Sequence, residues 1–315
     1  MRLPGLDGSL FPKPDSVVRT VTKVAEAVSK KVGNAAFGLA GDGFEAVAQA
    51  SKPLFNHSSS RADGKTYVVD GQTGETRAYD PQRDGDAIVY QNGILNDEQG
   101  AHDSAMALSK KTGKPVVVTY NSSEGFVPDV TQSVLDKLDP LNLVHQNRAT
   151  DSQAELMYQS ASSDQPRTFV SHSQGAIITR DALVRTHARL YGEKFTETLK
   201  RTHDPVRAHL EAQRYADDKM KNVKVVTAGG AALAWPPYAN VTHVTNTADL
   251  VPNAFGQSVL FDPVETAREL LPAGTPLPNG DRPDVVVVNE PTDPHDGFVG
   301  HSFEGVYLDD VAKHV

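Results

Sequence analysis

The chain has 315 residues, a formal net charge of −9, no cysteine, and 38% hydrophobic and 23% charged residues. This length allows one large domain or two small ones, and the composition is typical of a globular protein. The lack of cysteine excludes disulfides, thiolate nucleophiles and cysteine-ligated zinc, and the negative charge argues against a nucleic-acid partner.

The first residues predict neither a secretory signal nor a membrane anchor. MRLPGLDGSLFPKPD lacks a basic head followed by an apolar core, and no run reaches the roughly 18 apolar residues of a membrane span. We therefore expect a protein that is cytoplasmic as synthesised. Export by a dedicated secretion system is left open.

Residues 1–60 are expected to form a helical segment that is packed on, or appended to, a main domain of residues 61–315. Four valines recur there at helical spacing: Val17, Val21, Val24 and Val28. The polar face of this helix is not strongly basic, which argues against stable membrane binding and leaves only a transient contact with a membrane surface open.

The main domain alternates short β-branched segments with helical patterns. After a predicted β-hairpin over 65–79, strands are predicted at 87–93, 115–120, 168–171, 223–227, 241–245 and 285–288. Helices are predicted at 98–112, 130–138, 151–160 and 175–191, with a last one after residue 301. This order predicts an α/β fold with a mostly parallel central sheet covered by helices on both faces.

One predicted strand leads into a predicted helix through a serine-containing turn. FVSHSQGAII, residues 169–178, places Ser173 between Ser171 and Gly175. This run resembles the G-x-S-x-G nucleophile elbow of the α/β-hydrolase superfamily, with Ser171 in place of the first glycine. The resemblance implies an α/β-hydrolase fold in which Ser173 is the nucleophile and presents its hydroxyl to solvent. Neighbours on such a turn point apart, so His172 is expected to be a packing residue.

A serine nucleophile needs an acid and a histidine further along the chain, in the order Ser, acid, His. Asp249 stands in an Asp-Leu-Val-Pro loop that resembles the acid loop of class 3 lipases. His301, in GFVGHSFEGVYL, resembles the closing segment of lipase-like hydrolases. His295 lies in the same loop as His301 and is kept as an alternative base.

The oxyanion hole of this superfamily uses the N–H after the nucleophile and one from the loop after an early strand. The resemblance therefore implies the N–H groups of Gln174 and Ile94, with Gly93 allowing the tight backbone turn. Asn92 stands where the family has a histidine. The resemblance covers about residues 85–315.

Together these residues predict a serine carboxylic ester hydrolase that resembles class 3 lipases and bacterial lipase effectors, and no metal or cofactor is expected. The expected substrate is a lipid or small-molecule ester, and the first hypothesis is a lipase or phospholipase that acts in lipid degradation. Residues 193–221 and 257–283 are long enough to form lids. Two alternatives stay open: a small-molecule esterase, thioesterase or amidase of the same fold, and an inactive α/β-hydrolase-fold binding protein. Secretion machinery and a cognate inhibitor are further partners that this resemblance leaves open.

Overall fold

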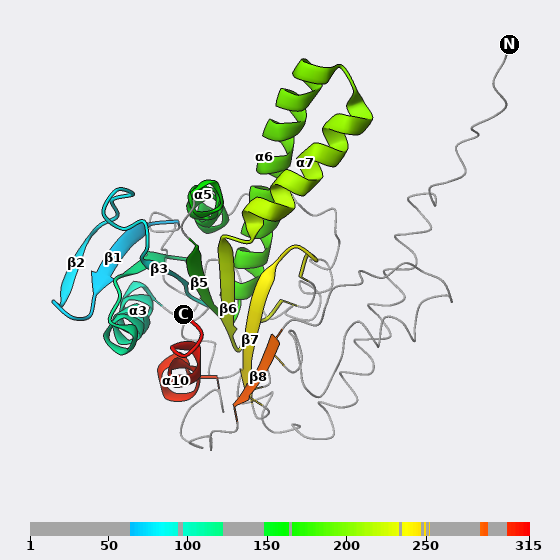
Figure 1. The fold of residues 1–315 in the computed structure, drawn as a ribbon. Coiled ribbons are helices and arrows are strands. Elements are labelled where there is room, and N and C mark those ends of the chain that lie inside the picture. The colour runs from blue at the N-terminus through cyan, green and yellow to red at the C-terminus, as the bar shows by residue number, and fades with distance from the viewer. Residues whose placement is uncertain are drawn as a thin grey trace, which may run out of the picture.

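The computed structural model describes residues 64–93, 97–121, 148–163, 166–232, 235–246, 249, 252, 284–288 and 301–315. They form an α/β fold around a mixed, mostly parallel eight-stranded sheet with the strand order β2-β1-β4-β3-β5-β6-β7-β8 (Figure 1). The strands from β3 to β8 run parallel to one another, whereas β1 runs antiparallel to both β2 and β4.

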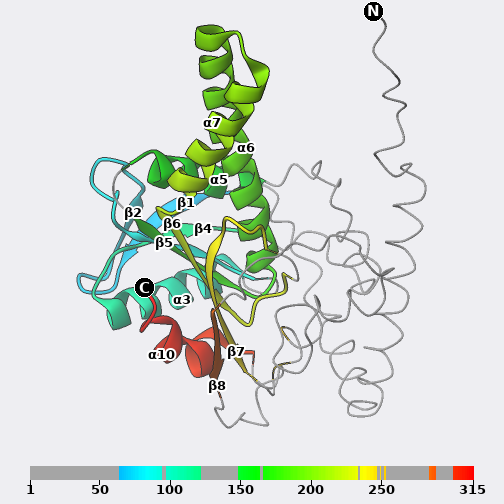
Figure 2. The same cartoon turned by 45° about the vertical axis from the view of Figure 1, so that its right-hand side comes forward.

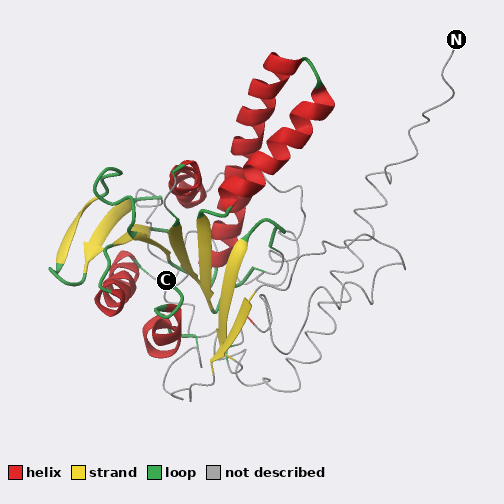
Figure 3. Ribbon diagram, in the orientation of Figure 1, coloured by secondary structure: helices red, strands yellow, loops and turns green. Residues whose placement is uncertain are grey.

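Figure 3 shows the described helices in red and the described strands in yellow. The strands are β1 (Thr66–Asp70), β2 (Glu75–Ala78), β3 (Ile88–Gln91), β4 (Val116–Thr119), β5 (Arg167–His172), β6 (Val223–Ala228), β7 (Asn240–Asn246) and β8 (Asp284–Val288). The helices are α3 (Glu98–Thr112), α5 (Arg148–Ser162), α6 (Gly175–Thr202), α7 (Pro205–Met220), the π-helix η2 (Phe303–Tyr307) and α10 (Leu308–Val311).

The expectation of a mostly parallel sheet with helices on both faces is confirmed. The predicted segments 1–60, 130–138 and 257–283 lie outside the described residues. The predicted helix 175–191 is longer in the structure, because α6 continues to Thr202 before His203 ends it in a left-handed conformation.

Two apolar clusters fill the two faces of the sheet, since successive strand residues point to opposite faces. On one face, Tyr90 and Val170 pack with α3, η2 and α10. On the other face, Val89 and Phe169 pack with α5, α6 and α7. Both clusters draw on the same strands, which explains why those strands are continuous apolar runs instead of alternating ones.

The helices α6 and α7 form a hairpin that extends beyond the sheet in both views (Figure 1 and Figure 2). Asp204 caps α7 by accepting hydrogen bonds from the N–H groups of Val206 and Arg207, both at 3.0 Å. A stripe of small residues on α7 is buried: Ala208, Ala212 and Ala216. The segment 193–221, from the end of α6 through α7, is therefore helical and packs through one buried stripe, while most of its other side chains are exposed or half-buried.

The strand order reverses between β3 and β5. From β3 the sheet continues to β4 on one side, and on the other side it continues through β5, β6, β7 and β8. The carboxyl ends of β3 and β5 thus lie side by side, with Gln91 paired to Ser171. In open α/β sheets, this reversal point is where the chain leaves room for a ligand.

Candidate active site

Ser173 occupies a sharp turn at this reversal point. The strand β5 ends at His172 and α6 begins at Gly175, so Ser173 and Gln174 make the whole connection. The φ angle of Ser173 is +56°, in the left-handed region that costs an L-residue about 1–2 kcal/mol. The end of β6 and the residues after it hold this conformation, since the N–H of Ser173 donates to the carbonyl of Ala228 at 3.1 Å and its carbonyl accepts from the N–H of Ala231 at 3.0 Å.

Two glycines allow the backbones to approach each other around this turn. A Cβ atom on Gly175 would lie 2.7 Å from the carbonyl oxygen of Gln91 and 2.8 Å from that of Asn92. A Cβ atom on Gly93 would lie 2.5 Å from the Cβ of Ser173 and 3.1 Å from its Oγ. Real Cβ atoms do not come this close to such neighbours, so both positions require glycine.

Ser173 is more enclosed than the sequence predicts. Ser173 is only 5% exposed. The reason is visible in its surroundings, since the backbone of Gly93 lies directly against the serine side chain. The loop that we expected to supply an oxyanion donor therefore also lies against the side chain of Ser173.

Asp249 and His301 form a hydrogen-bonded pair. His301 Nδ1 lies 2.7 Å from Asp249 Oδ2, and the two side chains are 12% and 1% exposed. The residues are far apart in the chain, and each follows a strand: Asp249 comes after β7 and His301 after β8. A carboxylate accepts the Nδ1 proton of a neutral imidazole, which leaves Nε2 with the lone pair of a base.

Tyr307, which the sequence analysis missed, holds the same carboxylate. Its hydroxyl donates to Asp249 Oδ2 and accepts a hydrogen bond from the N–H of Asn246 at 3.3 Å. Burial and the neighbouring Asp249 raise the pKa of Tyr307 far above its usual value, so the phenol stays protonated and remains a donor. The signal available in the sequence was a tyrosine six residues after the candidate base.

The rings of His172 and His301 connect this pair to the serine turn. Their centroids are 4.7 Å apart, and His172 is the residue immediately before Ser173. The structure therefore brings His301, Asp249 and the serine turn to one edge of the sheet. His172 is 7% exposed and packs against the rings of Phe303 and Tyr307, as expected of a packing residue.

The predicted oxyanion donors are described only in part. The N–H of Gln174 lies at the N-terminus of α6, where the first N–H groups of a helix have no carbonyl partner within that helix. Such groups and the helix dipole favour a negative charge. Gly93 lies against Ser173, as described above, whereas Ile94 lies outside the described residues.

A buried amide network fixes the loop beside these donors. Asn92 Nδ2 donates to the carbonyl of Asn121 at 3.0 Å, and the N–H of Asn121 donates back to Asn92 Oδ1 at 2.8 Å. The side chain of Asn121 also donates to Gln174 Oε1 at 3.2 Å. Asn92 thus bonds across the ends of β3 and β4. Asn121 was not predicted from the sequence, although an asparagine directly after a buried strand is a usable signal.

Several other histidines and aromatic residues lie outside this arrangement. His295 lies outside the described residues. His243 is buried on β7, where its Nδ1 lies 2.7 Å from the hydroxyl of Thr227 and Trp235 packs edge-on against its ring. Tyr238 stacks on His187 at 3.9 Å. Trp235 and Tyr238 therefore have packing partners of their own.

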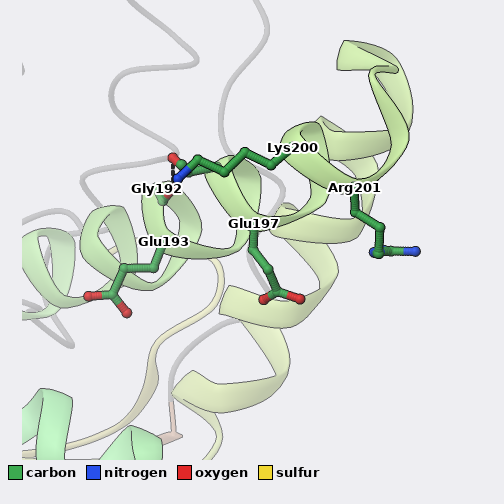
Figure 4. A pocket seen from close by; sticks show the side chains of 6 residues that line it. Gly192, Glu193, Glu197, Lys200 and Arg201 are labelled. Carbon is green, nitrogen blue, oxygen red and sulfur yellow. Dashed lines mark hydrogen bonds between the residues drawn. The ribbon is translucent and has the colours of Figure 1, made fainter.

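A hollow on the surface of α6 lies away from this site. Its lining includes Glu193, Lys200 and Arg201 (Figure 4). An α-helix rises 1.5 Å per residue, so Glu193 is roughly 27 Å along α6 from Gly175. Since α6 starts at the carboxyl edge of the sheet and runs away from it, the segment 193–221 does not lie over Ser173. The lid suggested for that segment stays a prediction.

Comparisons with family models, curated proteins and solved structures returned no match to this chain. Among the described residues, no three His, Cys, Asp or Glu side chains are grouped so that they could hold a metal ion. In the same part of the chain, none of the helices combines the length and the apolar character needed to cross a bilayer.

Proposed function

We propose that this chain is a serine hydrolase of the α/β-hydrolase superfamily that cleaves carboxylic esters through an acyl-enzyme. The observation that carries the proposal is the His301–Asp249 hydrogen bond at the same edge as the left-handed turn at Ser173. The three residues follow β5, β7 and β8 in the chain order Ser, acid, His, which is the order of that superfamily.

In the proposed mechanism, Ser173 Oγ attacks the carbonyl carbon of the ester while His301 Nε2 accepts the hydroxyl proton. Asp249 keeps the imidazole in the tautomer that has a free Nε2 lone pair and stabilises the imidazolium that forms. His301 then gives its proton to the leaving alcohol, and the acyl group stays on Ser173. Water attacks the acyl-enzyme, its proton passes to His301, and release of the carboxylic acid restores the serine hydroxyl.

The tetrahedral intermediates carry a negative charge on the former carbonyl oxygen. In the proposal the backbone N–H groups of Gln174 and Ile94 donate to this oxygen. The amide network of Asn92, Asn121 and Gln174 supports this role, because it fixes the ends of β3 and β4 and the start of α6 relative to one another. Preorganised donors need no rearrangement as the charge develops.

For the substrate, we propose a lipid ester, which makes the protein a lipase or phospholipase. The support is the likeness of the Asp-Leu-Val-Pro loop around Asp249 to the acid loop of class 3 lipases. A small-molecule esterase, thioesterase or amidase and an inactive binding protein of the same fold are the alternatives. Export by a secretion system and inhibition by a cognate protein are proposals that depend on the same likeness.

The test is incubation of the wild-type protein and Ser173→Ala with a total lipid extract, followed by mass spectrometry of the lipids. We expect fatty acids and their deacylated partners to appear only with the wild type. Hydrolysis of short-chain esters without any lipid hydrolysis would favour the small-molecule alternative. Equal product from both proteins would refute the assignment of Ser173.

A second pair of variants identifies the base. His301→Ala should abolish hydrolysis, because the imidazole that bonds to Asp249 is lost. His295→Ala should retain it. Full activity of His301→Ala together with loss of activity in His295→Ala would transfer the role of base to His295.

A further inference from the structure

His172 makes two contacts with His301, the residue that we propose as the base. Its Nε2 lies 2.9 Å from the backbone carbonyl oxygen of His301, and the two rings are in contact in a tilted arrangement, with centroids 4.7 Å and planes 31° apart. One contact fixes the backbone of His301 and the other fixes its side chain. Both come from the last residue of β5, next to Ser173.

The hydrogen bond determines the tautomer of His172. A carbonyl oxygen only accepts, so the proton is on Nε2 and Nδ1 is bare in the neutral ring. Nδ1 is buried and has no hydrogen-bond partner among the described residues. Since Nε2 is occupied and Nδ1 is enclosed, His172 is not a rival base for Ser173.

The environment also keeps His172 uncharged. Phe303 and Tyr307 pack against its ring, with centroids 5.7 Å and 6.3 Å away. Burial, together with the neighbouring His301, lowers the pKa of His172 to about 3. A neutral neighbour does not oppose the positive charge that His301 acquires when it takes the serine proton.

We propose that His172 is a positioning residue, which aligns the imidazole of His301 with Ser173 by donating to the His301 carbonyl and packing against its ring. This inference rests on the proposed function and adds to it a link between nucleophile and base. The strand end that carries Ser173 also holds the base, so the two reacting groups share one support. Such alignment matters because a displacement of about 1 Å in a catalytic group can lower the rate about 100-fold.

Two substitutions separate the hydrogen bond from the ring. His172→Phe keeps a buried ring and removes the donor, whereas His172→Gln keeps an N–H donor near the position of Nε2 and removes the ring. His243→Phe is the matched control. His243 is 4% exposed, its pKa is also lowered to about 3 by burial, and it lies on β7 in contact with Thr227 and Trp235.

The experiment measures kcat and KM with p-nitrophenyl butyrate for the full chain, below the unfolding temperature of each variant. We expect His172→Phe to lower kcat about 100-fold while KM changes less than about threefold. The kcat of His172→Gln should be at least about tenfold higher than that of His172→Phe. The control His243→Phe should keep the kcat of the wild type. A purely structural role would lower the unfolding temperature without this split between kcat and KM.

Two results overturn the inference. If His172→Phe keeps kcat within about threefold of the wild type, the alignment has no catalytic effect. If His172→Gln falls as far as His172→Phe, the donated hydrogen bond is not what matters. In both cases an active wild type leaves the proposed function intact, whereas a wild type that does not react with esters or with a fluorophosphonate overturns both proposals.

Discussion

The left-handed backbone at Ser173 predicts an unusual effect on stability. We compare Ser173→Gly with Ser173→Ala, because both remove the hydroxyl and differ only in whether a Cβ is present. At a φ of +56° the Cβ costs about 1–2 kcal/mol, while glycine loses about 0.5–1 kcal/mol through the greater freedom of its unfolded chain. The glycine variant should therefore be about 0.5–1 kcal/mol more stable than the alanine variant.

Urea denaturation measures this difference, and thermal unfolding should show it as a shift of about 1–4 °C for a domain of this size. His203 provides the control, because it is the other described non-glycine residue with positive φ, at +54°, and it ends α6 far from the site. The free energy of unfolding of His203→Gly should exceed that of His203→Ala by a similar amount. If glycine is favoured at 203 but not at 173, the strained turn at Ser173 is refuted.

Three further predictions follow from the surroundings of the site. Tyr307→Phe removes the hydroxyl that donates to the buried carboxylate of Asp249. It should lower the free energy of unfolding in urea by about 1.5–3 kcal/mol and also slow ester hydrolysis. If neither value changes, this hydrogen bond is unimportant. Gly175→Ala places a methyl group 2.7 Å and 2.8 Å from two carbonyl oxygens at the end of β3, so a cost of about 1–3 kcal/mol is expected, and an equally stable variant would contradict this packing. Both His172 and His243 have a pKa of about 3 in the folded state, against about 6.5 in the unfolded chain. Below about pH 6.5 the unfolded chain therefore binds more protons than the folded protein, so the free energy of unfolding decreases as the pH is lowered. Each should remove about 2 kcal/mol between pH 7 and pH 5 in urea titrations, and a free energy of unfolding that stays constant over this range would argue that these rings are not buried as neutral groups.

The sequence predicted the sheet well because its strands are buried on both faces. Segments such as 115–120 and 223–227 are short and rich in valine and threonine, a pattern that favours a strand over a helix. Their order along the chain then constrained the architecture, since parallel strands need crossover connections. The extent of α6 was harder to predict, because the second half of that helix packs on α7 through small residues and carries many charges.

The site was predictable where a residue type has a local reason to be present. Gly93 and Gly175 could be predicted because tight turns need glycine, and Asp249 and His301 were proposed because each stands after a predicted strand in a segment that resembles lipase-like hydrolases. Tyr307 was not found, since its role depends on a contact with a residue 58 positions away. Such a contact leaves no periodicity or spacing in the sequence.

The enclosure of Ser173 has the same explanation. A turn read from sequence shows which residues are small, but it does not show which other segment packs against them. Here the end of β3 approaches from a neighbouring strand and places Gly93 on the serine. Packing between strands that are distant in the chain therefore decided how far the hydroxyl is exposed.

The most direct test of the account is covalent labelling of the wild-type protein with a fluorophosphonate, followed by peptide mass spectrometry. An activated serine forms a phosphonyl ester, whereas an ordinary buried serine does not react. The account predicts one adduct, located on Ser173, that is lost in His301→Ala. An unlabelled wild type, or an adduct on a different residue, would contradict the claim that His301 activates Ser173.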